Sequence, residues 1–564
     1  MSEKMTGGQL VVKMLESLGV RRVFGVVGGQ TLAITDAIID TPGIEMVHTR
    51  HENAAAVMAD AYGRLTGTPA VAIATTGPGA TNLLTGVGGA FRDSSPAIII
   101  TCNNNGENIH KDDAQNADHV KIFEPFTKFS RLVAHASSIK QAMEEAYVAA
   151  MTGNPGPVHL DFARDTIENV VDAPPAVPAT HPSRDWVGTR PVPAPSAIAE
   201  VAERVLAAER PVIWVGNGGN RAKAADDVLA LADALNIPVI TTFNGMGAVP
   251  TDHPLVFGAL SRMGTALTSR VLAESDLVLA LGNSLNAVST RRWKTPLPPV
   301  VQVDVDPTMI GRYYSETTTG VVGDLGAFCT SMIEATAGGA AAARESRTGW
   351  VAELGEAESR WWALTESREP ETPGTVSPAV VVRALREVTP PEAVLIPDAG
   401  NPGVWSFLWE MPRPYRYIKP VGFGNMGFAL PAAIASVADD PERPVLALIG
   451  DGSLGMSLGE IETLARTGGP VCIVVLNDSS YGNIRQEQEL HFDGRTIGVD
   501  FDEVDFAKVA EGMGVPGRRA TTVDELVDAV KQAFASGRPA LVDVVLDRAA
   551  NAWTYEAFLP HQAG

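Results

Sequence analysis

Two acidic residues stand directly after apolar segments rich in branched side chains: Asp451 follows VLALIG, and Asp478 follows VCIVVLN. Both segments are typical of buried parallel strands. Neighbouring parallel strands end at one edge of a sheet, so the two carboxylates can face a single ion. Such oxygen ligands suit Mg²⁺, and Gly450 and Gly452 let a phosphate approach the backbone. The pattern predicts a metal and diphosphate site, followed by a helix from near Leu458.

This arrangement resembles the signature of thiamine diphosphate (ThDP) enzymes. Within them it is similar to the acetolactate synthase-like branch, which also contains oxalyl-CoA decarboxylase, 2-hydroxyacyl-CoA lyase and benzaldehyde lyase. The resemblance implies ThDP and Mg²⁺, with the metal held by Asp451, Asp478 and the backbone carbonyl of Ser480. The family usually has Asn-Asn where this chain has Asn477-Asp478, which adds a negative charge. The alternative is a Gly-Asp-Gly turn in an ordinary α/β protein.

Other segments match the same family pattern. In PVGFGNMGFALP, the resemblance places Met426 between the two cofactor rings and assigns the Gly424 carbonyl to the 4′-amino group. TTGPGATN resembles the loop that contacts the pyrimidine, and DAGNPGVW resembles a second diphosphate loop. A core Met and plain strand-to-helix turns are the alternative readings. The predicted cofactor contacts are Gly28, Gly29, Pro78, Asn82, Asn401, Gly424, Met426, Gly452, Ser453 and Tyr481.

Two residues of the first third of the chain are predicted to be catalytic. Glu52 begins a predicted helix, and the resemblance pairs it with N1′ of the aminopyrimidine, which promotes the imino form that removes the C2 proton. The alternative is a first-turn carboxylate that complements the helix dipole. Gln115 matches a position that points at the substrate, where a neutral amide suits carboligation or lyase chemistry. The alternative is a surface glutamine.

The segment after the metal turn departs from acetolactate synthases proper. They carry Met and Trp where this chain has Asn483 and Glu487, which argues against acetolactate or acetohydroxybutyrate synthesis. If Glu487 lines the cavity, it could donate or accept a proton. The alternative is a solvated helix face shared with Glu489.

The elements that must position these residues fall into three blocks of apolar strands alternating with helical patterns, which predicts three doubly wound parallel-sheet α/β domains. By resemblance these are a pyrimidine-binding domain at 1–180, a central nucleotide-binding-like domain at 190–340 and a diphosphate-binding domain at 370–550. Residues 171–196 and 337–349 are interpreted as linkers. Residues 551–564 are expected to form a tail or a lid.

The central block leaves its ligand open. Relatives bind FAD, an ADP or CoA moiety, or nothing in this domain. The segment GNSLN resembles the acyl-CoA branch. Arg291, Arg292 and Lys294 form a local basic patch that suits a CoA phosphate, although such patches are more often surface loops.

The amino-acid composition limits which partners and which cellular location are expected for the protein. The net charge of −22 argues against nucleic acid or an anionic membrane as a partner. The three cysteines are far apart, and no signal peptide or membrane-spanning run is visible, so a cytoplasmic enzyme is expected. By resemblance, the cofactor would lie between two subunits of a homodimer or homotetramer.

The predicted function is a ThDP- and Mg²⁺-dependent carbon-carbon lyase or carboligase. Its small-molecule substrate would be a 2-oxo acid or a 2-hydroxy carbonyl compound, processed through a thiazolium carbanion and an enamine. A 2-hydroxyacyl-CoA lyase or an oxalyl-CoA decarboxylase-like enzyme is the second hypothesis. A non-catalytic ThDP-binding protein is the third.

Overall fold

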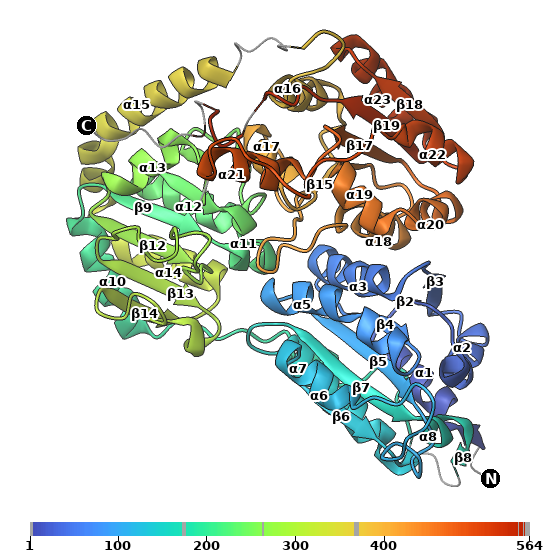
Figure 1. The fold of residues 1–564 in the computed structure, drawn as a ribbon. Coiled ribbons are helices and arrows are strands. Elements are labelled where there is room, and N and C mark those ends of the chain that lie inside the picture. The colour runs from blue at the N-terminus through green and yellow to red at the C-terminus, as the bar shows by residue number, and fades with distance from the viewer. Residues whose placement is uncertain are drawn as a thin grey trace.

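Three α/β domains follow one another along the chain (Figure 1). The structure is a computed structural model that describes residues 4–171, 176–261, 264–365, 372–550, 552–555 and 558. Each domain is built on a twisted parallel sheet with helices on both faces, because its strands are continuous apolar runs that must be covered on both sides. The predicted fold class is confirmed.

The first domain carries a six-stranded sheet in the order β3-β2-β4-β5-β7-β6, with all pairs parallel. Its strands are β2 (Arg22–Gly25), β3 (Glu45–His48), β4 (Ala70–Ala74), β5 (Ala97–Asn103), β6 (Ser130–Val133) and β7 (Pro157–Ala163), beside a small pair of β1 (Met5–Thr6) and β8 (Val170–Val171). Its helices are α1 (Gly7–Ser17), α2 (Leu32–Ile39), α3 (Glu52–Thr66), α4 (Pro78–Asn82), α5 (Leu84–Arg92), α6 (His119–Phe123), α7 (Ile139–Met151) and α8 (Arg164–Glu168).

The central domain carries a six-stranded parallel sheet in the order β11-β10-β9-β12-β13-β14. Its strands are β9 (Pro211–Val215), β10 (Val239–Thr242), β11 (Val256–Leu260), β12 (Leu277–Leu281), β13 (Val300–Asp304) and β14 (Thr318–Val322). Its helices are α9 (Ser183–Trp186), α10 (Pro195–Ala207), α11 (Asn217–Ala222), α12 (Ala225–Leu235), α13 (Ala266–Ala273), α14 (Leu325–Thr336) and α15 (Ala340–Thr365).

The third domain carries a five-stranded parallel sheet in the order β15-β16-β17-β19-β18. Its strands are β15 (Val394–Pro397), β16 (Val445–Gly450), β17 (Val471–Asn477), β18 (Gly517–Ala520) and β19 (Ala540–Val545). Its helices are α16 (Pro378–Val388), α17 (Asn401–Trp405), α18 (Ala429–Asp439), α19 (Asp451–Ser457), α20 (Glu460–Thr467), α21 (Gly482–His491), α22 (Phe506–Gly512) and α23 (Val523–Ser536).

One expectation about local structure was wrong. The segment 337–349 is not a linker, because α15 runs from Ala340 and packs on the central domain, where Arg347 donates to the carbonyls of Val205 and Leu235. Alanine is the best helix former, and the buried face of α15 outweighs the glycines in the segment. The helix expected near Leu458 is α20, which begins at Glu460, and the Gly-Asp-Gly-Ser segment before it belongs to a further short helix, α19.

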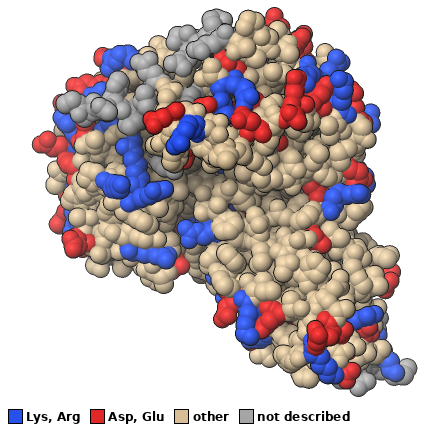
Figure 2. Space-filling model, viewed as in Figure 1, with Lys and Arg blue, Asp and Glu red and all other residues tan. Residues whose placement is uncertain are grey.

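The first and third domains share a core. Helix α3 packs against α18, and small side chains of both helices are fully buried together. The seam between these domains appears largely uncharged in Figure 2, while acidic and basic side chains gather around it. The two halves of the predicted cofactor site therefore belong to domains that are docked within one chain.

The C-terminal segment is only partly described. Tyr555 and Phe558 are buried, and their rings contact Trp405 with centroids 5.1 and 5.4 Å away. The rest of the predicted tail or lid lies largely outside the described residues. In the described parts of the chain, no helix is long and apolar enough to cross a membrane.

Candidate cofactor site

The third-domain half of the site is built around Asp451 and Asp478. Asp451 is the buried first residue of α19, and its carboxylate accepts the backbone N-H groups of Gly452 at 2.9 Å and Ser480 at 3.1 Å. Burial, followed by the negative charge of Asp478, raises the pKa of Asp451 to about 7. Burial also raises the pKa of Asp478. A divalent cation would offset both effects, so the donor set fits the predicted metal.

The two residues that end β17 have different roles. The Asn477 side chain is buried and donates to the Val504 carbonyl at 3.1 Å and to Asp543 at 2.9 Å, so it anchors the strand. Asp478 is the one whose charge acts on Asp451. Within the described residues no cluster of three or more His, Cys, Asp or Glu could hold a metal ion.

The predicted diphosphate contacts surround this pair. A Cβ on Gly482 would lie 2.4 Å from Asp478 Oδ2 and 3.1 Å from the amide nitrogen of Asn401, so Asn401 reaches the site. Asn483 donates to Asn401 Oδ1 at 3.0 Å. The Tyr481 ring lies against Gly452, and Ser453 is buried in the first turn of α19. Residues of three separate loops thus converge, as predicted.

Residues 421–429 of the third domain, which include the predicted ring contacts Gly424 and Met426, are held at both ends by buried carboxylates. Asp398 accepts the N-H groups of Gly427 at 3.1 Å and Ala429 at 2.8 Å. Asp93, which belongs to the first domain, accepts that of Gly422 at 2.8 Å. Between these anchors Gly424 is exposed with a φ of 73°, and Met426 is half-buried. We call this segment the 421–429 loop.

Asp93 joins all three domains. It pairs with Arg64 at 2.9 Å, and Arg64 also pairs with Asp60 at 2.6 Å and donates to the Lys419 carbonyl at 2.7 Å. Asn244 of the central domain donates to Asp93 Oδ1 at 2.8 Å. Sequence reasoning missed Asp93, because each of its partners outside the first domain is more than a hundred residues away.

The first-domain half of the site contains Glu52, the first residue of α3. Its Oε2 accepts from the side-chain amide of Asn82 at 3.0 Å, and its Oε1 lies beside Gly79. Pro78 and Asn82 are exposed on α4. Gly28 lies against Thr75, next to this group, and Gly29 begins the short turn that follows. The structure therefore brings Glu52, Pro78, Asn82 and Gly28 together.

Gln115 lies beside the same group. Residues 76–78, which we call the 76–78 turn, contact it through Gly77, where φ is 61° and a Cβ would lie 2.4 Å from the Gln115 carbonyl oxygen. Only glycine tolerates this conformation with that contact. The Thr76 hydroxyl donates to the same carbonyl at 3.1 Å. The Gln115 side chain is exposed, so its predicted approach to a substrate stays a prediction.

Within one chain the two halves are joined at the start of α3. Glu460 of α20 accepts the N-H groups of Arg50 at 3.0 Å and His51 at 3.1 Å, so the start of α3 is tied to the third domain. Yet no hydrogen bond or ion pair among the described residues joins Glu52 to Asp451 or Asp478.

Glu487 lies on α21, one turn after Asn483 and on the same face of the helix. Its side chain is partly buried. Glu489, which is also partly buried, pairs with Arg485 at 2.8 Å.

A cavity of about 340 Å³ lies where the central domain meets the other two. Its walls include Asn217, Arg221 and Asp304 at the ends of central strands, and Arg64 and Asp93 of the first domain. Its lining residues do not include Arg291, Arg292 and Lys294, the basic patch that would suit a CoA phosphate but is more often a surface loop. Arg291 instead donates to Ser269 at 2.9 Å.

Comparisons with known proteins agree with this geometry. Sequence models described as the N-terminal TPP binding domain, the central domain and the C-terminal TPP binding domain of thiamine pyrophosphate enzymes match residues 5–122, 198–332 and 398–544. The chain is 32% identical to the acetolactate synthase large subunit of Corynebacterium glutamicum, over 98% of this chain and 88% of that protein. It is also 32% identical to the acetolactate synthase large subunit of Haemophilus influenzae, over 97% of this chain and 95% of that protein. The chain therefore belongs to the thiamine diphosphate enzyme family, in its acetolactate synthase-like branch.

Proposed function

We propose that this chain is a ThDP- and Mg²⁺-dependent carbon-carbon lyase or carboligase that acts on a free 2-oxo acid or a 2-hydroxy carbonyl compound. The observation that carries the proposal is the buried pair Asp451 and Asp478 beside the Gly452 and Asn401 turns, an arrangement with excess negative charge. The similarity to acetolactate synthases over nearly the whole chain supports the same reaction class.

When bound, ThDP supplies a nucleophilic carbon that adds to a carbonyl group and stabilises the negative charge that develops there. Asp451, Asp478 and the Ser480 carbonyl would hold Mg²⁺, with Asn401 and Ser453 near the diphosphate. The side-chain amide of Asn82 donates a hydrogen bond to Oε2 of Glu52. We therefore assign Oε1 of Glu52 to share a proton with a ring nitrogen of the cofactor.

We assign substrate contacts to Gln115 and Glu487. Gln115 can donate a hydrogen bond to a developing negative oxygen without exchanging a proton. Glu487 shares the face of α21 with Asn483, which contacts Asn401 beside Asp478. A carboxyl group there can donate or accept a proton during bond formation or cleavage.

We also propose that the working unit is at least a homodimer. Glu52 and the Asp451 pair belong to separate half-sites in one chain, and the surface around them exposes apolar groups such as Phe423 at 44% and Met456 at 55%. A second copy could complete each site and cover these side chains.

A second candidate function is a 2-hydroxyacyl-CoA lyase or an oxalyl-CoA decarboxylase-like enzyme. The cavity beside the central sheet favours it, because Arg190, Arg221 and Lys223 line a space that could take an ADP or CoA phosphate group. The same space could take the adenine nucleotide part of FAD, which would not change the reaction class.

A substrate panel separates these functions. Purified protein with ThDP and Mg²⁺ is given free 2-oxo acids, 2-hydroxy ketones and CoA thioesters, and the products are identified by mass spectrometry. Turnover of free 2-oxo acids to carboligated products supports the first function. Formyl-CoA release from a 2-hydroxyacyl-CoA, with no turnover of free acids, would replace it with the second.

A further inference from the structure

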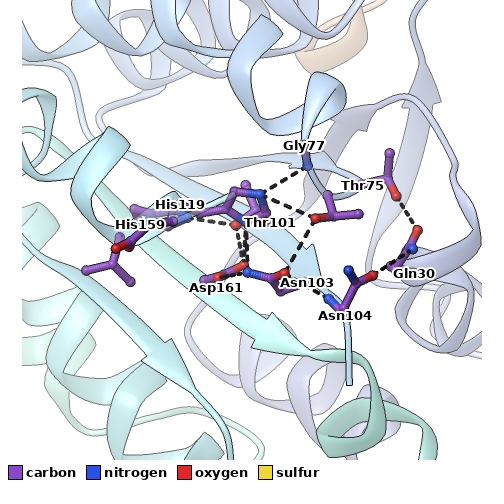
Figure 3. Close-up of polar contacts among 12 residues, drawn as sticks. Gln30, Thr75, Gly77, Thr101, Asn103, Asn104, His119, His159 and Asp161 are labelled. Carbon is purple, nitrogen blue, oxygen red and sulfur yellow. Dashed lines mark hydrogen bonds and ion pairs between the residues drawn. The ribbon is translucent and has the colours of Figure 1, made fainter. Parts of the chain in front are cut away.

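A network of buried polar side chains lies beneath the 76–78 turn in the first domain. His119, His159 and Thr101 have no exposed surface, and Asp161 and Asn103 are 1% exposed. Figure 3 shows these side chains between β5, β7 and α6, with His119 pointing at Gly77. Neither the metal site nor the predicted cofactor contacts include any of them. A network of this size inside a core needs every member to be paired.

The hydrogen bonds assign the protonation of His119. The backbone N-H of Gly77 can only donate, and it lies 3.1 Å from His119 Nε2, so Nε2 carries no proton. The ring proton is then on Nδ1, which donates to Asp161 Oδ1 at 2.9 Å. Asp161 thus fixes the tautomer that turns a lone pair toward the backbone of the turn.

Asp161 is itself oriented by its neighbours. Its carboxylate accepts from the Thr101 hydroxyl at 2.7 Å and from the Asn103 amide at 2.8 Å. Because Thr101 donates to Asp161, it must accept from His159 Nε2, which lies 2.8 Å away. His159 Nδ1 then accepts from the Ser130 hydroxyl at 2.8 Å. The chain of bonds runs in one direction from Ser130 to Asp161.

The other end of the network is the predicted site. The 76–78 turn contacts the Gln115 carbonyl through Thr76 and Gly77 and leads through Pro78 into α4. Helix α4 ends at Asn82, whose amide donates to Glu52. A shift of Gly77 would therefore move both the exposed Pro78 and the partner of Glu52.

We propose that His119 is a positioning residue for the cofactor: held by Asp161 as the Nδ1-H tautomer, it accepts the Gly77 N-H and so sets the placement of Pro78 and Asn82. This inference rests on the proposed binding of ThDP at the first-domain half of the site. His119 acts through Gly77 and makes no contact with the cofactor.

Two substitutions test the two hydrogen bonds of His119 one at a time. In His119→Asn the amide nitrogen can take the place of Nδ1 and donate to Asp161, but nothing accepts the Gly77 N-H. In His119→Gln the longer side chain can place its oxygen near the former Nε2 and accept that N-H, while the donor to Asp161 is lost. His135→Asn, at an exposed histidine, is the matched control.

The readouts are the ThDP dissociation constant, measured by calorimetry in excess Mg²⁺, and the melting temperature. We expect His119→Asn to weaken ThDP binding about tenfold, as loss of one buried hydrogen bond does, and His119→Gln to stay within about threefold of the unmodified protein. Both variants should melt at similarly lowered temperatures. Equal loss of affinity in the two variants, in step with their melting temperatures, would show a structural role only and overturn the proposal.

If His119→Asn fails to fold, Thr101→Val provides the same test from one step further away. It keeps the shape of the side chain but removes the hydroxyl that orients Asp161. We expect weaker ThDP binding in Thr101→Val, while the Mg²⁺ concentration that binding requires stays unchanged. Unchanged ThDP binding would contradict the proposal. Failure of the unmodified protein to bind ThDP would instead remove the proposed function.

Discussion

The two halves of the site are held in place by different means. The 76–78 turn of the first domain is held by the imidazole of His119 and by the carbonyl of Gln115, both from its own domain. The 421–429 loop of the third domain is held by carboxylates from two domains, Asp398 and Asp93. The 76–78 turn therefore depends on a core within one domain, whereas the 421–429 loop depends on how the domains dock.

The chemistry of the anchors differs as well. Burial raises the pKa of Asp398 to about 6, although three backbone N-H groups donate to it. Burial also lowers the pKa of the nearby Lys419 to about 8. The first-domain turn instead rests on a neutral histidine, so only Asp161 behind it carries a charge. A neutral anchor costs less desolvation, and a charged anchor binds backbone N-H groups more strongly.

The largest effect is expected from substitution of Glu52, which should impair proton transfer in the first-domain half of the site without displacing its residues. Glu52→Gln keeps an oxygen for Asn82 but cannot share a proton, so we expect kcat to fall by about 10³-fold or more. ThDP C2 hydrogen exchange, followed by NMR, should slow in parallel. Asp36→Asn on the exposed face of α2 is the control. Normal exchange in Glu52→Gln would remove Glu52 from its assigned role.

The next largest effect tests the docking of the second half. Asp93→Asn removes a buried charge from between Arg64 and the 421–429 loop, so we expect a loss of about 3 kcal/mol in the free energy of unfolding. Limited proteolysis should then cut between domains more readily, and ThDP binding should weaken. If Asp93→Asn leaves both unchanged, the loop does not need the first domain.

Much of the difference between the two halves of the site could not be predicted from the sequence. Asp451 and Asp478 were predictable, because each follows an apolar strand and neighbouring strands end at one edge. Asp93 was missed, since its partner Gly422 in the 421–429 loop lies 329 residues further along the chain. No pattern in the sequence points to His119, and its burial against Asp161 became visible in the structure. The helix α15 was missed because glycines among its alanines resembled a linker.

A smaller effect is expected at the face of α21. Glu487→Gln should lower kcat about 100-fold with little change in ThDP affinity, because the amide cannot exchange a proton. Glu489→Gln is the matched control, since Glu489 pairs with Arg485. Steady-state kinetics on the best substrate measures both. Similar rates for the two variants would assign Glu487 to a solvated helix face.

The smallest effect concerns pH and the core of the first half. Burial lowers the pKa of His159 to about 3, although the negative charge of Asp161 opposes the shift. The unfolded chain takes up this proton near pH 6.5, so the stability contributed by neutral His159 is lost as pH falls below that value. Between pH 7 and pH 5 we expect a loss of about 2 kcal/mol, absent from His159→Gln. Urea unfolding at both pH values measures it, and parallel losses in the two proteins would contradict the expectation.

Magnesium-dependent ThDP binding tests the central claim most directly. Isothermal titration of the purified protein with ThDP, with and without Mg²⁺, should show binding that requires the metal. Asp451→Asn should need at least about tenfold more Mg²⁺, because the buried pair loses one of its two carboxylate ligands. Asp478→Asn should need less extra metal, since it restores the residue usual in the family and keeps an oxygen ligand. Binding of ThDP without Mg²⁺, or unchanged metal dependence in Asp451→Asn, would contradict the account.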